Sequence, residues 1–152
     1  MKEFKGRVVV PGTAKALALV SYEGFNTLAS FQKSLMFKDK EGTCSDQNNK
    51  DLYKKKMAGK ALCLPQTIGS TTGGMVLYCA SALGIVPSCL LFSKPIDSLA
   101  AAGAILSDIW TESNLPTIDN LGDEFLNYVK DDMTIEILDG GIVRVGENNE
   151  NI

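Results

Sequence analysis

The chain has 152 residues, 45% of them hydrophobic, which suits a single globular domain with a sizeable core. Its 15 Lys and Arg against 18 Asp and Glu give a formal net charge of −3, which disfavours a nucleic-acid-binding surface. No apolar run is long enough to span a bilayer and no signal peptide is evident, so we expect a cytoplasmic protein that binds neither nucleic acid nor membrane.

The first third of the chain is predicted to hold two strands and a long loop. Strands are expected at 4–10 and 14–20, paired with each other across a Pro-Gly turn. From 21 to 59 the apolar residues are spaced irregularly among polar ones. This spacing predicts a loop with short local structure, whose aromatic side chains pack on the core.

The rest of the chain alternates between strands and helices. The predicted elements are, in order, a strand at 61–64, a loop at 66–74, a helix at 75–83, a strand at 85–92, a helix at 97–110, a strand at 115–118, a short helix within 121–129, and a hairpin of 133–138 with 142–145. Asp97 is the candidate N-cap of its helix. This order predicts a mixed α/β domain over residues 1–146, followed by a disordered tail at 147–152.

The loop 66–74 is the strongest candidate for a binding site. Its glycines let a ligand approach the main chain, and the hydroxyls of Ser70, Thr71 and Thr72 can cap the following helix. The amides and partial positive charge at a helix start favour anions. The loop lacks both the Walker A lysine and the G-x-G-x-x-G spacing, so a purely structural turn explains it about equally well.

The cysteines and the absence of histidine limit the chemistry open to this chain. The sequence contains no His, and its four cysteines form no C-x-x-C pair, so we expect no metal site made by this chain alone. Cys63, Cys79 and Cys89 lie in apolar runs and are expected to behave as buried hydrophobic residues. Cys44 lies in a polar loop and is predicted to be the accessible cysteine.

An ordered set of short motifs runs through nearly the whole chain. The motifs are Gly6-Arg7 with Val10-Pro11-Gly12, Asp46 with Leu52-Tyr53, Leu64-Pro65 with Gly69-Ser70-Thr71, Pro87, Asp97 with Gly103-Ala104-Ile105, and Asp139-Gly140. This set resembles the small, swivelling domain of the aconitase-X family. The resemblance implies a swivelling β/β/α fold, with a mixed sheet or partly open barrel and flanking helices, related to the small subunit of isopropylmalate isomerase.

The resemblance also implies an activity. Members of the family are hydro-lyases, or dehydratases, in which an iron ion or iron–sulfur cluster is expected in the large subunit, so this chain would be inactive without that partner. By the resemblance, Ser70 enters the active cleft and acts in proton transfer at the substrate. Gly69, Thr71, Thr72 and Gly73 would stabilise its alkoxide and admit a substrate carboxylate or phosphate. The alternative role for Ser70 is a helix N-cap without chemistry.

A second segment, Asp46 with Asn48 and Asn49, is a further candidate for contact with substrate, because its side chains offer both donors and acceptors. An exposed turn is the slightly favoured alternative. Two positions depart from the family pattern. Ile68 stands where many relatives carry a basic residue, and Asn48-Asn49 stand where many carry a His. The apolar Ile68 argues against a phosphorylated substrate.

The leading hypothesis is therefore the small subunit of an aconitase-X-type dehydratase that acts on a small hydroxy acid or hydroxy amino acid, with cis-3-hydroxy-L-proline as the nearest substrate. Mevalonate 5-phosphate is the alternative substrate. A non-catalytic anion- or partner-binding module and a structural subunit without a ligand are the alternatives from other classes. A permanent complex with a large subunit predicts an exposed apolar face near Phe25, Phe31 and Ile68.

Overall fold

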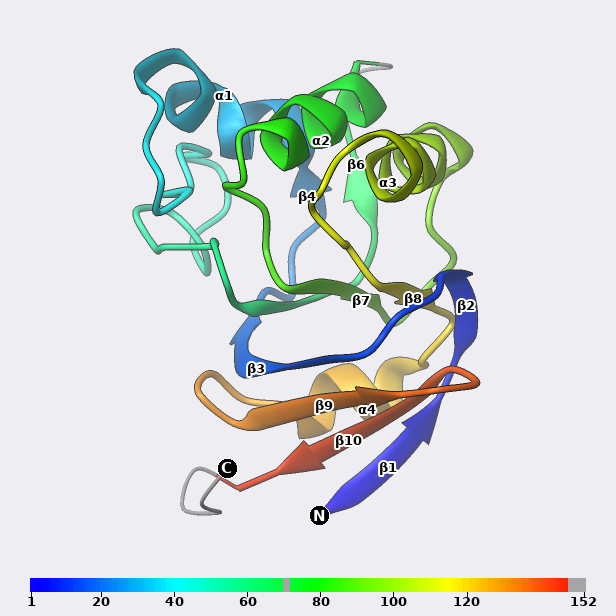
Figure 1. Cartoon of the computed structure of the whole chain (residues 1–152). Helices are drawn as coiled ribbons and strands as arrows, with labels where there is room; N and C mark the ends of the chain where they lie inside the picture. The colour runs from blue at the N-terminus through cyan, green and yellow to red at the C-terminus, as the bar shows by residue number, and fades with distance from the viewer. Residues whose placement is uncertain (70–71, 148–152) are drawn as a thin grey trace.

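The computed structural model describes residues 1–69 and 72–147 and contains an eight-stranded sheet flanked by helices (Figure 1). The strands of this sheet are β1 (Lys2–Lys5), β2 (Arg7–Val10), β3 (Ala14–Val20), β5 (Ala61–Leu64), β7 (Cys89–Phe92), β8 (Thr117–Asp119), β9 (Thr134–Leu138) and β10 (Ile142–Gly146). Strands β4 (Phe25–Asn26) and β6 (Thr67–Ile68) form a separate parallel pair. The helices are α1 (Thr27–Phe37), α2 (Gly73–Ala82), α3 (Ser98–Trp110) and α4 (Asp123–Tyr128).

The sheet closes on itself at Gly6. Its strand order is β1-β10-β9-β3-β5-β7-β8-β2, so β1 and β2 stand at opposite ends of the order although only Gly6 separates them in the chain. The Gly6 N–H donates to the carbonyl oxygen of Gly141 at 3.0 Å, and a Cβ on Gly6 would lie 2.4 Å from the carbonyl oxygen of Asp119. The prediction of one continuous strand at 4–10 is therefore wrong, because the chain passes here through a position that has no room for a side chain.

The pairing of the strands makes the sheet mixed. Strands β3, β5, β7 and β8 pair in parallel, whereas β9, β10, β1 and β2 each pair antiparallel with a neighbour. Because β3 pairs with β5 and β9, the predicted pairing of the first two strands is wrong. The predicted fold class, a mixed α/β domain with a partly open barrel and flanking helices, is confirmed.

Two apolar cores lie on the two faces of the central strands. In β5, Leu62 and Leu64 pack with the core beneath α1, α2 and α3, whereas Ala61 and Cys63 pack inside the barrel with Phe125 of α4. Figure 1 shows α1, α2 and α3 on one side of the central strands and β9, β10 and β1 on the other. Strands buried on both faces are apolar throughout, which is why the strand at 61–64 is predicted correctly.

Helix α1 is the main element that the sequence prediction misses. It occupies part of the expected loop at 21–59, which is therefore wrong over this range. Asn26 caps the helix, because its Oδ1 accepts a hydrogen bond from the Ala29 N–H at 3.1 Å. The side chains that α1 buries are Thr27, Ser30, Phe31 and Ser34. These positions have helical spacing, but three of the four carry hydroxyls, so apolar periodicity does not reveal the helix.

The remaining elements agree with prediction after small shifts. Helices α2, α3 and α4 and the β9–β10 hairpin are confirmed, and Gly140 and Gly141 turn the hairpin with φ of +80°. The strand predicted at 85–92 begins only at Cys89. Of the predicted tail, residues 148–152 lie outside the described residues. Within residues 1–69 and 72–147, no helix is long and apolar enough to cross a membrane.

Candidate functional site

A cavity of about 240 Å³ lies beyond the carboxyl ends of the parallel strands β5 and β7, where the first turns of α1, α2 and α3 meet. We call it the loop cavity. Its lining residues are Thr27, Thr67, Ile68, Gly69, Gly73, Asp97, Leu99 and Ala100. Ligands of α/β proteins bind outside the carboxyl ends of parallel strands, so the loop cavity occupies the place where this architecture binds small molecules.

The small β4–β6 pair holds the glycine-rich loop at this cavity. Asn26 pairs with Ile68 in parallel register, and the Phe25 N–H donates to the Gln66 carbonyl oxygen at 2.8 Å. Gly69 has φ of +106°, and a Cβ there would lie 2.9 Å from the Asn26 side chain, so this position requires glycine. The register therefore fixes where the chain leaves β6 and enters the loop.

Three of the five loop residues predicted to form the site can be located in the structure. Gly69 and Gly73 line the loop cavity, and Thr72 stands at the N-cap position of α2. Ser70 and Thr71 lie outside the described residues. The predicted roles of all five residues in catalysis or substrate binding stay predictions, and the structure shows that the loop from which they come reaches the cavity.

Asp97 joins the loop to α3 across the cavity. Its Oδ2 accepts a hydrogen bond from the Thr67 hydroxyl, and its Oδ1 accepts from the N–H groups of Leu99 at 3.0 Å and Ala100 at 2.9 Å. The predicted N-cap role is confirmed, but neither Asp97 nor Thr67 was predicted to lie in the site. The available signal was their position, because each follows the end of one of two predicted strands that turn out to be neighbours.

The electrostatic character of the loop cavity is balanced. Three helix N-termini point their partial positive charges at it, each equivalent to about half an elementary charge, and the carboxylate of Asp97 opposes them. The lining residues include neither Lys nor Arg. Besides the Asp97 carboxylate, hydroxyls and main-chain groups therefore make up the polar surface of the described lining.

The segment of Asp46, Asn48 and Asn49 does not line the loop cavity. Asn48 is exposed, but Asp46 is 6% and Asn49 only 1% exposed, so the alternative of an exposed turn is wrong for these two residues. The Oδ1 of Asn49 accepts from the Ser21 hydroxyl at 3.2 Å, just beyond the end of β3, and its Nδ2 is buried without a hydrogen-bond partner. The contact of this segment with substrate stays a prediction.

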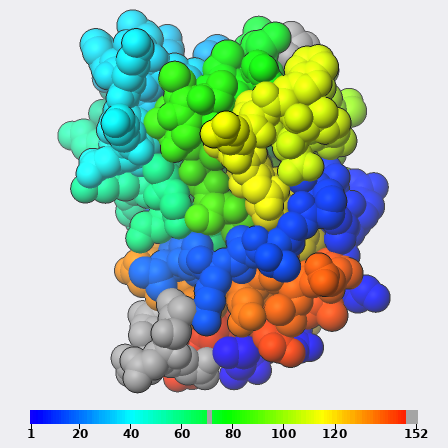
Figure 2. Space-filling model, viewed as in Figure 1, coloured from blue at the N-terminus to red at the C-terminus, as the bar shows by residue number. Residues whose placement is uncertain are grey.

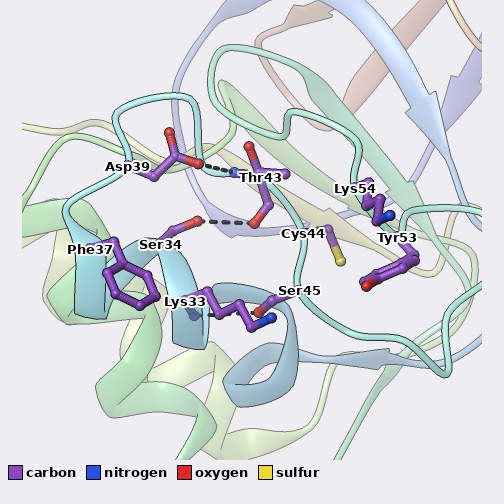
Figure 3. Close-up of a pocket in the computed structure, with 9 residues that line it drawn as sticks. All are labelled: Lys33, Ser34, Phe37, Asp39, Thr43, Cys44, Ser45, Tyr53 and Lys54. Carbon is purple, nitrogen blue, oxygen red and sulfur yellow. Dashed lines mark hydrogen bonds between the residues drawn. The ribbon is translucent and has the colours of Figure 1, made fainter.

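A separate cavity of about 330 Å³ lies between α1 and the polar segment that follows it (Figure 3). Its lining residues are Lys33, Ser34, Phe37, Asp39, Thr43, Cys44, Ser45, Tyr53 and Lys54. The Ser34 hydroxyl donates to the Thr43 carbonyl oxygen at 3.0 Å, and hydrogen bonds from the Thr43 side chain and then from the Glu41 and Thr43 N–H groups lower the pKa of Asp39. Most polar groups of this cavity therefore stabilise the segment itself.

Cys44 borders that second cavity but is only 1% exposed, so the prediction that it is the accessible cysteine is wrong. Main-chain hydrogen bonds of 2.9 Å join it to Lys54 and Lys55, and burial raises the pKa of its thiol. Cys79, on α2, is instead the half-buried one.

The donor groups of the described residues do not fit an iron ion or an iron–sulfur cluster. No group of three or more His, Cys, Asp and Glu side chains lies close enough together within residues 1–69 and 72–147 to hold a metal ion. Cys63 and Cys89 lie on neighbouring strands inside the barrel, where burial raises the pKa of Cys89 to about 12 and raises that of Cys63 well above its usual value. A cysteine binds a metal ion as its thiolate, and burial disfavours the thiolate at both positions.

Comparisons with known proteins relate this architecture to one family. Residues 3–145 match the family model described as Aconitase X swivel domain. The phosphomevalonate dehydratase small subunit of Methanocaldococcus jannaschii is 33% identical over 107 residues, which cover 70% of this chain and 75% of that protein. The protein of the same name from Thermococcus kodakarensis is 27% identical over 149 residues, covering 97% and 99%. The crystal structure of Thermococcus kodakaraensis aconitase X in its holo form superposes with a TM-score of 0.80 at 28% identity, covering 97% of this chain and 100% of that chain.

Proposed function

Because the chain belongs to the aconitase X swivel domain family, we propose that it is the small subunit of an aconitase-X-type dehydratase and completes an active site on a large subunit. The names of the curated relatives support this proposal, since they are small subunits of a dehydratase. The observation that carries it is the loop cavity, which brings the glycine-rich loop to the meeting point of three helix N-termini.

The large subunit would hold the iron ion or iron–sulfur cluster, since the donor groups described in this chain do not fit one. In a dehydratase such a metal serves as the Lewis acid for a leaving hydroxyl. The residues of this chain would bind and orient the substrate and move a proton. The isolated chain would then be inactive.

We assign the proton transfer to Ser70, which lies outside the described residues. The observation that supports this assignment is that Gly69 and Gly73, on either side of Ser70 in the sequence, border the loop cavity. In a dehydration, a base removes a proton from one carbon, the hydroxyl on the adjacent carbon takes up a proton and leaves as water, and a double bond forms between the two carbons. A serine that acts as the base needs its alkoxide stabilised, and the amino end of α2, which begins at Gly73, supplies partial positive charge at the loop cavity.

Phosphomevalonate is the first substrate to test, because the curated relatives are named for it. The cis-3-hydroxy-L-proline predicted from the resemblance is the second, and one observation favours it. The lining of the loop cavity contains neither Lys nor Arg, and Ile68 stands there with 51% of its surface exposed. A phosphate would need cationic groups from the large subunit, whereas a single carboxylate would not.

The test is co-expression of the chain with the large subunit from the same genome, followed by co-purification, iron analysis and dehydration assays on both substrates. Ser70→Ala should leave the complex and its iron content intact and lower the dehydration rate by at least about 100-fold. The matched control is Ser88→Ala, because Ser88 precedes the opposite end of β7. A fully active Ser70→Ala complex would favour the non-catalytic binding module. Failure of the chain to co-purify with the large subunit would refute the proposal.

A further inference from the structure

The outer surface of α2 and α3 is almost free of charge. Helix α2 contains no charged residue and α3 contains only Asp108. Figure 2 shows both helices at the surface on the same face of the molecule, α2 in green and α3 in yellow. A helix face that meets water is normally covered with charged and polar side chains, so this surface has the composition of an interface.

Helix α3 turns its small residues inward and its large apolar residues outward, whereas α2 buries Val76 and Leu77 and exposes Met75. In α3, Ala100, Gly103, Ala104 and Ser107 are buried. The exposed side chains of α3 include Leu99 at 48%, Ile109 at 64% and Trp110 at 67%. A helix that used its apolar side chains to stabilise the isolated domain would have the reverse orientation. The large apolar side chains of α3 are therefore exposed to water, although apolar side chains of this size are normally buried.

A groove of about 320 Å³ runs between the two helices, and we call it the α2–α3 groove. It is lined by Gly74 and Gly103, where the two helices come closest, and by Met75, Tyr78, Leu99, Ala102, Leu106 and Trp110. Tyr78 and Trp110 contact each other edge to face, with ring centroids 6.3 Å apart. None of the lining residues carries a charge, so the groove fits an apolar segment of a protein.

Continuity with the loop cavity indicates which protein covers the groove. Leu99 lines both hollows, and Gly73 of the loop cavity is followed directly by Gly74 of the groove. A large subunit that carries iron to the loop cavity must therefore pass over the surface next to Leu99. A second copy of this chain in the groove would instead cover Leu99 and compete with the large subunit for the same place.

We propose that the α2–α3 groove is the docking site for an apolar segment of the large subunit; this inference rests on the proposed function. It revises the expected position of the apolar face. Phe25 and Phe31 are buried at 1% and 0% exposure and cannot contribute, whereas Ile68 is exposed beside the loop cavity as expected. The docking surface therefore extends from the loop along α2 and α3.

The structure offers a matched pair of variants for the test. Met75, in the groove, is 65% exposed, and Met36, on α1 outside the groove, is 66% exposed. Met75→Glu and Trp110→Glu should weaken binding of the large subunit by at least about 30-fold, the effect of losing a central apolar contact. Met36→Glu should change the affinity by no more than about twofold. All three residues are mostly exposed, so circular dichroism and melting temperature should show folded proteins.

Binding is measured by titrating immobilised large subunit with each small-subunit variant, with the dehydration rate measured at saturating small subunit. The groove variants should regain the wild-type rate at saturation, because they change docking and not chemistry. Unchanged affinity in both groove variants would overturn the docking proposal and leave the proposed function standing. A wild-type dimer that the groove variants convert to monomers, without any change in binding to the large subunit, would assign the groove to a second copy. Failure of the wild-type chain itself to bind would refute both proposals.

Discussion

Gly74 and Gly103 bring the main chains of α2 and α3 into direct contact. A Cβ on Gly103 would lie 2.2 Å from the carbonyl oxygen of Gly74, and a Cβ on Gly74 would lie 2.3 Å from the carbonyl oxygen of Leu99. This approach joins the two helices without any large side chain between them. The large apolar side chains of α3, such as Leu99 and Trp110, are left on the outer surface, and the first turns of both helices lie at the loop cavity.

Gly103→Ala should destabilise the domain, because the added methyl group has no room and the helices must move apart. Overpacking of this kind costs about 1–3 kcal/mol, and each kcal/mol lowers the melting temperature of a domain this size by about 2–4 °C. Gly73→Ala is the control, since the contact that its Cβ would make with the described residues is with Thr27, at an ordinary 3.6 Å. Thermal unfolding followed by circular dichroism measures both. Equal melting temperatures in the wild type and Gly103→Ala would show that the contact is looser than described.

Arg7 of β2 and Asp119 of β8 form a second link, which the Ile96 N–H extends to the loop that leads to α3. The Asp119 carboxylate is fully buried and accepts hydrogen bonds from Arg7 Nε at 2.9 Å, Arg7 Nη2 at 2.5 Å and the Ile96 N–H at 2.8 Å. Arg7→Ala would leave this buried carboxylate with the Ile96 N–H as its remaining donor in these contacts, which should lower the melting temperature. The melting temperature of Arg7→Lys should lie between those of the wild type and Arg7→Ala, because an ammonium group keeps the charge but cannot reproduce the planar two-point contact.

The control for this ion pair is Arg144→Ala. Arg144 Nε lies 2.7 Å from Glu3 Oε1, but both side chains are substantially exposed, at 40% and 54%. Exposed ion pairs contribute little to stability, so this variant should melt close to the wild type. A loss in Arg144→Ala as large as that in Arg7→Ala would show that the burial of Asp119 is not what matters.

The contrast between α1 and α3 shows how far the sequence predicts the fold. The α3 helix is predicted with its N-cap, because Asp97 directly precedes a run rich in alanine and leucine. The α1 helix is missed because Ser30 and Ser34 face inward, where the Ser34 hydroxyl donates to a main-chain carbonyl instead of to water. The local sequence pattern predicts most helices and strands, but it does not show which polar residues will form hydrogen bonds inside the protein.

The site was predictable only in part, for a similar reason. The loop around Gly69 can be recognised from the sequence, because its glycine and hydroxyl residues are adjacent in the chain. Thr67 and Asp97 are 30 residues apart and meet only because β5 and β7 are neighbours in the sheet. Strand order depends on long-range packing, which the sequence pattern of one chain does not contain.

Stability should fall at alkaline pH because of the buried thiols. Burial raises the pKa of Cys89 to about 12, whereas an unfolded thiol ionises near pH 8.5. Below about pH 8.5 both states keep the proton, and between there and about pH 12 only the folded state keeps it. The free energy of unfolding should therefore fall with rising pH in this window, by up to about 1.4 kcal/mol per pH unit for this thiol. Urea unfolding at several pH values from 8 to 11 measures the slope.

Cys89→Ala should flatten that slope, although it also lowers stability at every pH by leaving a small cavity. Cys79→Ala, at a half-buried position on α2, should keep the wild-type slope. Cys63, which lies on the neighbouring strand with its pKa also raised, would retain its own contribution in both variants. Identical slopes in the wild type and Cys89→Ala would rule out a contribution from this thiol.

Asp97 should influence both the stability of α3 and the charge preference of the assembled dehydratase. Asp97→Ala removes the cap and the bond to Thr67, and the loss of such a cap costs about 1 kcal/mol.

Asp97→Asn keeps an oxygen that can cap the helix but removes the one negative charge among the residues that line the loop cavity. In the complex with the large subunit, Asp97→Asn should therefore lower the KM for phosphomevalonate several-fold more than that for cis-3-hydroxy-L-proline, whose net charge is smaller. Asp108→Asn is the control, because this exposed residue lies on α3 outside the cavity lining. Equal changes in the two KM values would mean that the Asp97 charge does not face the substrate, and only the capping role would then stand.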